Sequence, residues 1–386
     1  MSIGAILAAL SLGIWIYLLL GRGGFWRGVD RDDRSPAFAE PVRWPDVVAV
    51  VPARNEADVI GHSLGSLLAQ DYPGRFSVVL VDDNSSDGTA GVARAAATAR
   101  PERLALIGGR PLPGGWTGKL WALEQGVAVA MQSVQPHYLF LTDADIVHRP
   151  DALRRLVARA EAGDLALTSL MVELRCRSFA ERALIPAFVF FFQMLYPFAW
   201  VRRRDRAIAA AAGGCSLVRS DALARAGGIV AIRHAVIDDC ALAALLKPHG
   251  PIWLGLTRCS RSIRPYPDIA DIRRMVARSA YAQLGYSPLI LLGTILGLLL
   301  TFAAPPLLAI FGTSLAVPTA AAAWLLMAVS FVPTLLFYEL SPLWAPALPA
   351  IATAYLLFTL DSAWQHLRGR GGMWKGRAQA TGTSRQ

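Results

Sequence analysis

The stretch VVAVVPARNE at residues 47–56 decides the fold, because an apolar run typical of a buried strand ends directly in charged and amide side chains. Two later stretches repeat this arrangement, SVVLV at 77–81 and YLFLT at 138–142, and LALIG at 104–108 is a further short apolar run. Three polar clusters follow apolar runs: Arg54-Asn55-Glu56, Asp82-Asp83-Asn84 and Asp143-Ala144-Asp145.

Helical segments separate these predicted strands. Apolar or alanine residues at helical spacing occupy 58–69, 89–99 and 118–133. Strands that alternate with helices predict βαβ units and a mostly parallel, doubly wound α/β sheet. Ligands bind such sheets beyond the carboxyl ends of the strands, so we expect the three polar clusters to form one site.

Asp143 and Asp145 are two residues apart in an extended segment, so both carboxylates are expected on the same face. Mg²⁺ usually binds one or two carboxylates together with substrate phosphates. One division is that Asp145 binds a divalent cation while Asp143 binds a ribose or a metal-bound water. The simpler alternative is a turn. His148 nearby is expected to be a surface or supporting residue rather than a ligand.

Two further groups are candidates for donor binding. Asp82 and Asp83 could accept a hydrogen bond from the ring N–H of a nucleobase, although the same residue types are common in turns. Lys119 opens a predicted helix, where it suits a diphosphate, or it is a solvated lysine. No Walker or G-x-G-x-x-G pattern is present, which disfavours ATPases and dinucleotide enzymes.

Asp238 and Asp239 begin a predicted helix after the glycine-rich segment 213–229. The helix dipole favours acids in a first turn, which is the simpler explanation. Alternatively, one of them is a general base that takes a proton from an attacking hydroxyl. Asp239 is the preferred base and Asp238 the runner-up.

The composition indicates a membrane protein with a soluble part. The 386 residues are 54% hydrophobic and 17% charged, whereas soluble domains carry about 25% charged residues. Disorder is excluded because it requires low hydrophobicity, and a purely embedded bundle is excluded because residues 40–280 hold most of the charges. The net charge of +10 comes from arginines beside apolar runs, which indicates a membrane surface rather than nucleic acid.

The apolar runs predict several membrane segments. Residues 3–20 can span a bilayer, and the arginines that follow place the next domain in the cytoplasm. Residues 279–338 contain no charged residue and no histidine, which allows two spans, and 340–360 is a weaker third run. A cytoplasmic tail requires an even number of spans, so either one run is re-entrant or interfacial, or the tail lies outside. The local charge bias favours a cytoplasmic tail.

Two segments are expected in the membrane interface. Residues 183–201 are aromatic and apolar and end in three arginines, but a span there would separate the acidic motifs. A buried core helix is the alternative. Residues 268–283 form a predicted amphipathic helix whose apolar face includes Ile272 and Val276, and we expect these two side chains to contact lipid.

Taken in order, VVPARNE, LVDDNSSDGT, TGKLWALEQG, TDAD and IDDCAL resemble the motifs of family 2 inverting glycosyltransferases of the GT-A type. The resemblance covers about residues 45–285 and is specific as an ordered set. LIPAFVFFFQMLYPFAWV, GPIWLGL and the terminal WKGR are most similar to bacterial hopanoid-biosynthesis-associated membrane glycosyltransferases, nearly over the full length.

The resemblance implies a Rossmann-like GT-A domain of α/β class, with a mostly parallel sheet and with N- and C-terminal transmembrane helices. It places the chain in the inner (cytoplasmic) membrane as a multi-pass protein. The expected segments are a transmembrane helix at 1–22, a cytoplasmic catalytic domain at 45–265 with an interfacial element at 183–204, an amphipathic interface helix at 266–285, transmembrane segments at 286–363 and a basic tail at 364–386.

The resemblance also implies the chemistry. One sugar would pass with inversion from a nucleotide-sugar, chiefly a UDP-sugar, to a lipid acceptor, with Mg²⁺ or Mn²⁺ as cofactor. Asp145 and Asp143 are the implied metal ligands, and Asp239, with Asp238, is the implied base. The implied substrate-binding residues are Pro52, Ala53, Asn55, Glu56, Asp82, Asp83, Lys119, Asp143, Gly213, Gly214 and Arg278.

One motif departs from the family. The Q-x-x-R-W sequence of processive synthases should fall near 272–283, where Met275-Val276-Ala277-Arg278-Ser279 matches only at the arginine, which argues against polymer synthesis. A catalytically silent scaffold in a lipid-synthesis complex is the alternative function, but retention of every acidic motif favours an enzyme. A sugar nucleotidyltransferase would need a glycine-rich basic loop after the first strand, which ARNE does not supply.

Overall fold

The structure is a computed structural model that describes residues 2–33, 38–313, 315–369, 373–374 and 377–378. The chain divides into two compact units. The sheet unit comprises Asp30–Arg175, Val201–Arg264 and Gly372–Gln386, and the helical unit comprises Met1–Val29, Cys176–Trp200 and Pro265–Gly371. Most of the basic tail expected at 364–386 lies outside the described residues.

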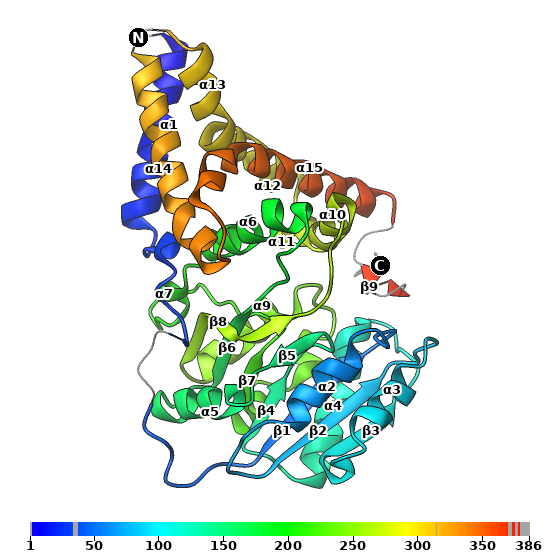
Figure 1. The fold of residues 1–386 in the computed structure, drawn as a ribbon. Coiled ribbons are helices and arrows are strands. Elements are labelled where there is room, and N and C mark those ends of the chain that lie inside the picture. Colours follow the sequence, from blue (N-terminus) through cyan, green and yellow to red (C-terminus); the bar gives the residue numbers. More distant parts are fainter. Residues whose placement is uncertain (1, 34–37, 314, 370–372, 375–376, 379–386) are drawn as a thin grey trace. The chain divides into compact units, whose positions relative to one another are not determined.

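An eight-stranded sheet forms the centre of the sheet unit (Figure 1). In sheet order its strands are β3 (Leu104–Gly108), β2 (Phe76–Asp82), β1 (Val47–Ala53), β4 (Tyr138–Leu141), β7 (Ser216–Arg219), β6 (Leu167–Glu173), β8 (Ile252–Ser262) and β5 (Ile146–His148). The first four are parallel, as predicted. In the other half only β6 and β8 pair in parallel, so the sheet is mixed.

Helices cover both faces of this sheet, which confirms the doubly wound α/β class. They are α2 (Ile60–Leu68), α3 (Thr89–Ala96), α4 (Gly118–Ser133), α5 (Ala152–Ala162), α8 (Ser220–Arg225) and α9 (Asp238–Leu246). Side chains of α2, α3 and α5 share one core cluster with Ala49 and Val51 of β1. Val50 points to the opposite face, where α4 packs, because successive strand residues alternate sides.

Gly126 allows α4 to approach the sheet closely. A Cβ atom at this position would lie 2.4 Å from Cγ1 of Val50 and 3.0 Å from Cγ2 of Val81. Both valines belong to fully paired central strands and cannot move without disturbing the sheet. The glycine therefore allows the middle of α4 to pack closely against β1 and β2.

We predict that Gly126→Ala lowers the free energy of unfolding by about 1–3 kcal/mol, the usual cost of overpacking a core. Gly91→Ala is the matched control, because Gly91 is also helical but its Cβ would meet nothing within 4 Å. This control should be neutral or stabilising, since alanine favours helices over glycine. Denaturant unfolding followed by circular dichroism measures both, and equal losses would contradict the close contact.

The helical unit contains the apolar helices. They are α1 (Ile3–Gly21), α6 (Phe179–Leu195), α10 (Ile269–Ala277), α11 (Ala280–Gln283), α12 (Pro288–Leu298), α13 (Ala304–Phe311), α14 (Ala316–Phe337) and α15 (Leu348–Leu367). The short helix α7 (Phe198–Val201) follows α6 in the chain, and the division between the units falls within it in sequence. By length and composition, five of the described helical segments could cross a membrane: Ile3–Gly21, Phe179–Val201, Pro288–Phe311, Ala316–Phe337 and Pro342–Leu367.

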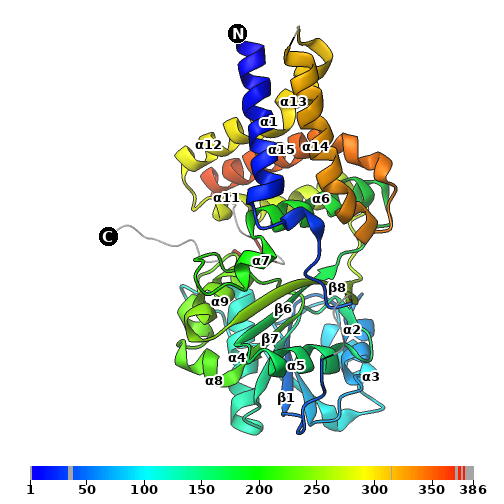
Figure 2. The same ribbon diagram turned by 90° about the vertical axis from the view of Figure 1, so that its left-hand side faces the viewer.

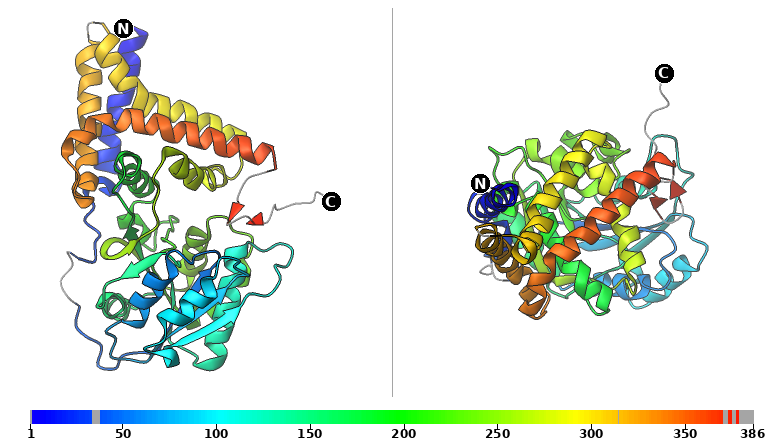
Figure 3. Two further views of the ribbon diagram at one scale, coloured as in Figure 1. Left: turned by 45° about the vertical axis from the view of Figure 1, so that its right-hand side comes forward. Right: turned by 90° about the horizontal axis from the view of Figure 1, so that it is seen from above.

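These helices run in two directions. Seen from above, α1 and α14 appear end-on, whereas α12 and α15 extend lengthwise (Figure 3), and a side view shows α1 upright and α12 crosswise (Figure 2). A π turn at Leu299–Ala303 joins α12 to α13 at the change of direction. The indole Nε1 of Trp15 donates a hydrogen bond of 2.8 Å to the carbonyl of Thr301 in this turn. Alanines at the starts of α1 and α14 pack together, so the two helices run in parallel.

The amphipathic segment at 268–283 is helical, as α10 and α11, but the two side chains expected to contact lipid are buried. Ile272 and Val276 are buried, and α10 packs against α15 and α6. Arg273 pairs with Asp361 of α15 at 3.0 Å, which holds the two helices together. The expectation that Ile272 and Val276 contact lipid is therefore wrong, because neighbouring helices of the same unit cover them.

Candidate active site

The predicted site residues of the sheet unit gather at the carboxyl ends of β1, β2 and β4, as the βαβ pattern requires. Register makes this possible, since Ala53 at the end of β1 pairs with Asp82 at the end of β2. The first turn of α4 and the first turn of α9 bring further charged side chains to the same edge.

Lys119 joins two of these segments. Its Nζ lies 2.8 Å from Oδ1 of Asp143, which follows β4, and 2.9 Å from Oδ2 of Asp238, which opens α9. Burial alone would lower the pKa of Lys119, but the two carboxylates outweigh burial and raise it. Lys119 is therefore a firmly charged ammonium and not the solvated lysine of the alternative interpretation.

Asp239 is held beside this ion cluster by backbone donors. Its Oδ2 accepts a hydrogen bond of 3.0 Å from the amide of Gly213, and its Oδ1 accepts one of 2.7 Å from the amide of Cys240. Withdrawal from water, reinforced by the negative charge of Asp238, raises the pKa of Asp239 to about 6, although Lys119 opposes the shift. A carboxylate with this pKa can take up a proton near neutral pH.

Gly213 keeps open the space that these groups face. A Cβ atom there would lie 3.2 Å from Nζ of Lys119, 3.7 Å from Asp239 Oδ2 and 3.8 Å from Asp143 Oδ2. The same groups line a small cavity of about 20 Å³, enough for a water molecule, together with Pro52 and the apolar side chains of Ile229, Ile232 and Leu242. The absence of a side chain at Gly213 therefore leaves room beside Lys119 and the acids.

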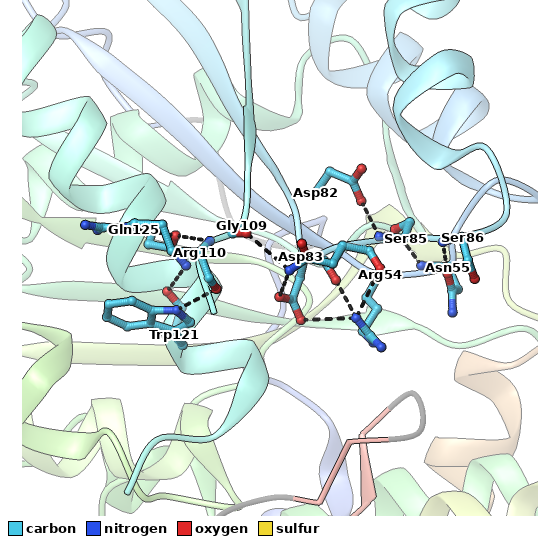
Figure 4. A network of polar contacts seen from close by, with 11 residues as sticks. Arg54, Asn55, Asp82, Asp83, Ser85, Ser86, Gly109, Arg110, Trp121 and Gln125 are labelled. Carbon is cyan, nitrogen blue, oxygen red and sulfur yellow. Dashed lines mark hydrogen bonds and ion pairs between the residues drawn. The ribbon is translucent and has the colours of Figure 1, made fainter. Parts of the chain in front are cut away.

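Asp83 forms a second, fully buried acidic position at the end of β2 (Figure 4). Nη1 of Arg54 donates to the Asp83 carbonyl at 2.5 Å and lies 3.8 Å from the Asp83 carboxylate. Gly109 packs against Asp83, where a Cβ atom would lie 3.0 Å from the Asp83 Cα. The Asp83 carboxylate is thus shielded from solvent at the end of β2.

The loops around Asp83 brace one another. Asn55, in the left-handed region at φ 50°, donates its amide N–H to Oγ of Ser85 and accepts from the amide of Ser86 (Figure 4). Asp82 accepts from the amide of Ser85 at 3.1 Å, so its side chain serves the turn. The ordinary turn interpretation therefore holds for Asp82, and Asp83 is the acid that points inward.

An unpredicted group of side chains lines the neighbouring strand end. Gln125 of α4 accepts from the Arg110 amide at 2.7 Å, and the indole of Trp121 donates to the Arg110 carbonyl at 3.1 Å (Figure 4). The Arg110 guanidinium lies over the Trp121 ring at 5.3 Å. The helical spacing of Trp121 and Gln125 could have indicated this shared face.

Asp145 belongs to a third contact set. Its Oδ2 accepts a hydrogen bond of 2.6 Å from Oγ of Ser262 and lies 3.4 Å from Nε of Arg264. The same guanidinium forms a hydrogen-bonded ion pair with Glu56. No motif in the sequence indicated Arg264, because it follows β8, a strand that the apolar pattern did not predict.

His148 is not on the surface, contrary to one expectation. It is buried, with Nε2 at 3.0 Å from Thr142 Oγ1 and Nδ1 at 2.8 Å from Ser260 Oγ. Burial lowers the pKa of His148 to about 3, so the ring is neutral. Both ring nitrogens are engaged in hydrogen bonds, and His148 supports the strand that carries Asp143.

The acids of the DAD motif suit a hard cation that is shared with phosphates. Asp143 and Asp145 supply carboxylate oxygens, the donors that Mg²⁺ and Mn²⁺ prefer. Among the described residues, no cluster of three His, Cys, Asp or Glu side chains could hold a metal by itself. Mg²⁺ commonly takes one or two carboxylates plus substrate phosphates, so these residues fit such an ion when a phosphate ligand is present.

The remaining predicted residues act through the backbone or lie elsewhere. Ala53 accepts a hydrogen bond of 2.8 Å from the Asp83 amide, and Gly214 accepts one of 2.8 Å from Thr142 Oγ1. Arg278 is the residue after α10, in the helical unit. Its role toward a substrate stays a prediction.

Comparison with known proteins defines the class of this domain. Residues 48–227 match the model of glycosyl transferase family 2, and the chain therefore carries a family 2 glycosyltransferase domain. The structure resembles the mannosyltransferase PcManGT from Pyrobaculum calidifontis, solved in complex with GDP-Man and Mn²⁺. The TM-score is 0.56 at 20% identity, over 95% of this chain and 100% of that chain. This likeness shows the GT-A fold.

Two relatives match by sequence. The succinoglycan biosynthesis protein ExoO of Rhizobium meliloti is 36% identical over 150 residues, 37% of this chain and 40% of that protein. The beta-monoglucosyldiacylglycerol synthase of Synechocystis sp. is 35% identical over 120 residues, 31% of this chain and 24% of that protein. The matches thus span less than half of these relatives.

Proposed function

We propose that this chain is a membrane-bound glycosyltransferase that moves one sugar, with inversion, from a UDP-sugar to a lipid hydroxyl. The observation that carries the proposal is the ion cluster of Lys119, Asp143 and Asp238 beside Asp239, in a family 2 domain. The glucolipid relative, which by name forms a diacylglycerol glycoside, supports a lipid acceptor. The sequence resemblance implies a place in hopanoid or related lipid biosynthesis and leaves the acceptor lipid open.

The donor would bind along the carboxyl ends of β1, β2 and β4. Buried Asp83 is suited to accept the ring N–H of uracil, because a buried carboxylate gains most from a charged hydrogen bond. Asp143 and Asp145 would hold Mg²⁺ or Mn²⁺, which would neutralise the departing diphosphate. Lys119, whose ammonium pairs with Asp143 in this structure, would also pair with the same phosphates.

Asp239 would act on the opposite side of the sugar. As the acceptor oxygen forms its bond to the anomeric carbon, the carbon–phosphate oxygen bond breaks and its electron pair leaves with the diphosphate. Asp239 takes the hydroxyl proton in the same step. Its two backbone hydrogen bonds fix its orientation, and its pKa of about 6 leaves it ionised at neutral pH.

We predict that Asp239→Asn lowers sugar transfer by about 10²–10⁴-fold, the usual worth of a positioned base. In the unmodified chain kcat/KM should fall as the pH drops through about 6, because protonated Asp239 cannot accept a proton. The variant should lose this acid limb and still bind UDP. Radiolabelled transfer to lipid, with equilibrium binding of UDP, measures both effects.

Two further variants make this test specific. Asp221→Asn is the control, since Asp221 is an exposed acid of α8 paired with Arg225, and it should leave transfer unchanged. If Asp238→Asn loses transfer while Asp239→Asn keeps it, the two roles are exchanged. Full activity in both would contradict the site, whereas the silent-scaffold alternative predicts no transfer by any form of the chain.

The helical unit suggests which apolar helices cross the membrane. At 1.5 Å per residue, α1 with 19 residues and α14 with 22 residues extend about 28 and 33 Å, enough for a hydrocarbon core. We propose that α1, the 24-residue segment Pro288–Phe311 that contains α12 and α13, and α14 cross, while α15 and α6 lie along the cytoplasmic side. The crosswise direction of α15 supports this division (Figure 3).

The division satisfies the requirement for an even number of spans. Two crossings, Pro288–Phe311 and α14, then separate the sheet unit from the tail, so both are cytoplasmic. The segment Cys176–Trp200 also leaves and re-enters the sheet unit, which a single crossing would forbid. α6 is therefore proposed as an element that does not span, despite its length and apolar character.

We predict that a cysteine at Thr313, between α13 and α14, reacts with a membrane-impermeant maleimide in intact cells. A cysteine at Arg368, just after α15, should react only in inverted vesicles. A five-span arrangement predicts the opposite side for one of the two positions, so labelling of both from the same side would contradict the proposal.

A further inference from the structure

Arg264 links the two polar loops that the donor is proposed to bridge. It follows β8, and its guanidinium pairs with Glu56 after β1 and with Asp145 after β4. The side chains of Glu56, Asp145 and Arg264 are only 7%, 13% and 23% exposed. This is a shielded ion triad, not a solvated surface pair of little energetic weight.

The triad is held in place by neighbouring groups. The hydroxyl of Ser262 donates a hydrogen bond of 2.6 Å to Asp145 and accepts one of 3.3 Å from the amide of Arg264. The amide of Ile263 donates to the Asp145 carbonyl at 3.0 Å. The end of β8 is thus shaped to present a fixed cation to Asp145, the acid proposed as a metal ligand.

We infer that Arg264 is an internal counter-ion that occupies Asp145 until a divalent cation arrives with the nucleotide, and that it then pairs with the donor phosphates. This inference rests on the proposed function. The guanidinium already lies within 3.4 Å of Asp145 Oδ2. A divalent ion on that carboxylate and an unscreened guanidinium repel each other at such a distance.

A diphosphate removes this conflict. Arginine binds phosphate oxygens through its planar array of donors, and phosphates between the metal and Arg264 screen their repulsion. Metal and nucleotide should therefore bind cooperatively, with Arg264 opposing the metal alone and favouring the metal–nucleotide pair. Lys119 has the analogous relation to Asp143, so each acid of the motif has its own resident cation.

The test is Mn²⁺ binding to the full-length chain in detergent, read from the electron paramagnetic resonance signal of free Mn²⁺. The wild-type chain should bind Mn²⁺ weakly alone and more tightly with UDP or GDP. Arg264→Gln should bind Mn²⁺ alone about tenfold more tightly, and the nucleotide should add less, because the competing charge is gone. Asp145→Asn in that variant should abolish the gain.

Arg261→Gln is the matched control. Arg261 is an exposed residue of the same strand, so its loss removes the same net charge without touching the triad. Arg261→Gln should bind Mn²⁺ as the wild-type chain does. If it tightens Mn²⁺ binding as much as Arg264→Gln does, the loss of one positive charge anywhere on this strand explains the effect and the inference is wrong. If Arg264→Gln unfolds, the double variant that combines it with Glu56→Gln is used, because it removes both charges of the Arg264–Glu56 pair. This double variant should still bind Mn²⁺ alone more tightly than the wild-type chain.

The outcomes separate the inference from the proposed function. If the Arg264→Gln chain matches the wild-type chain in Mn²⁺ affinity, both without and with nucleotide, Arg264 is merely structural. If nucleotide nevertheless tightens Mn²⁺ binding by both chains, the proposed function still stands. Absence of Mn²⁺ binding by the wild-type chain with either nucleotide would overturn both.

Discussion

One ammonium group organises the site. Lys119 reaches from the first turn of α4 to Asp143 after β4 and Asp238 at the start of α9, segments that are far apart in sequence. These side chains are largely shielded from water, so removing the cation would leave two poorly compensated carboxylates. The positions of α4 and α9, and hence of Asp239, depend on this cation. Gly126 contributes by letting α4 lie close to the sheet.

The same arrangement separates two chemical tasks. In the proposed reaction, Asp143 and Asp145 would hold the divalent cation and Lys119 would add positive charge where the diphosphate leaves, and the raised pKa of Asp239 suits the acceptance of a proton. Lys119 pairs with Asp143 and Arg264 pairs with Asp145, so both carboxylates are neutralised by side chains of the same chain when no ligand is bound. The helical unit contains long apolar helices suited to a bilayer, as the proposed transfer to a lipid would require.

Local patterns in the sequence predicted the first half of the sheet well. The strands β1 to β4 and the start of α4 lie within about two residues of the expected bounds, because each is a buried run ended by turn residues. β6, β7 and β8 were not predicted, since their pairing is set by distant partners. Arg264 was missed for that reason. Ile272 was misassigned because an amphipathic pattern cannot tell lipid from a packed helix.

The most direct measurement is the anomeric configuration of the product. The purified chain would be incubated with Mn²⁺, an α-linked UDP-sugar and extracted bacterial lipids, hopanoids included, and the glycolipid examined by nuclear magnetic resonance. Displacement with Asp239 as base predicts a single β-linked sugar on a lipid hydroxyl. An α-linked product, or a donor that binds and never yields a lipid-linked sugar, would contradict inverting transfer by this site.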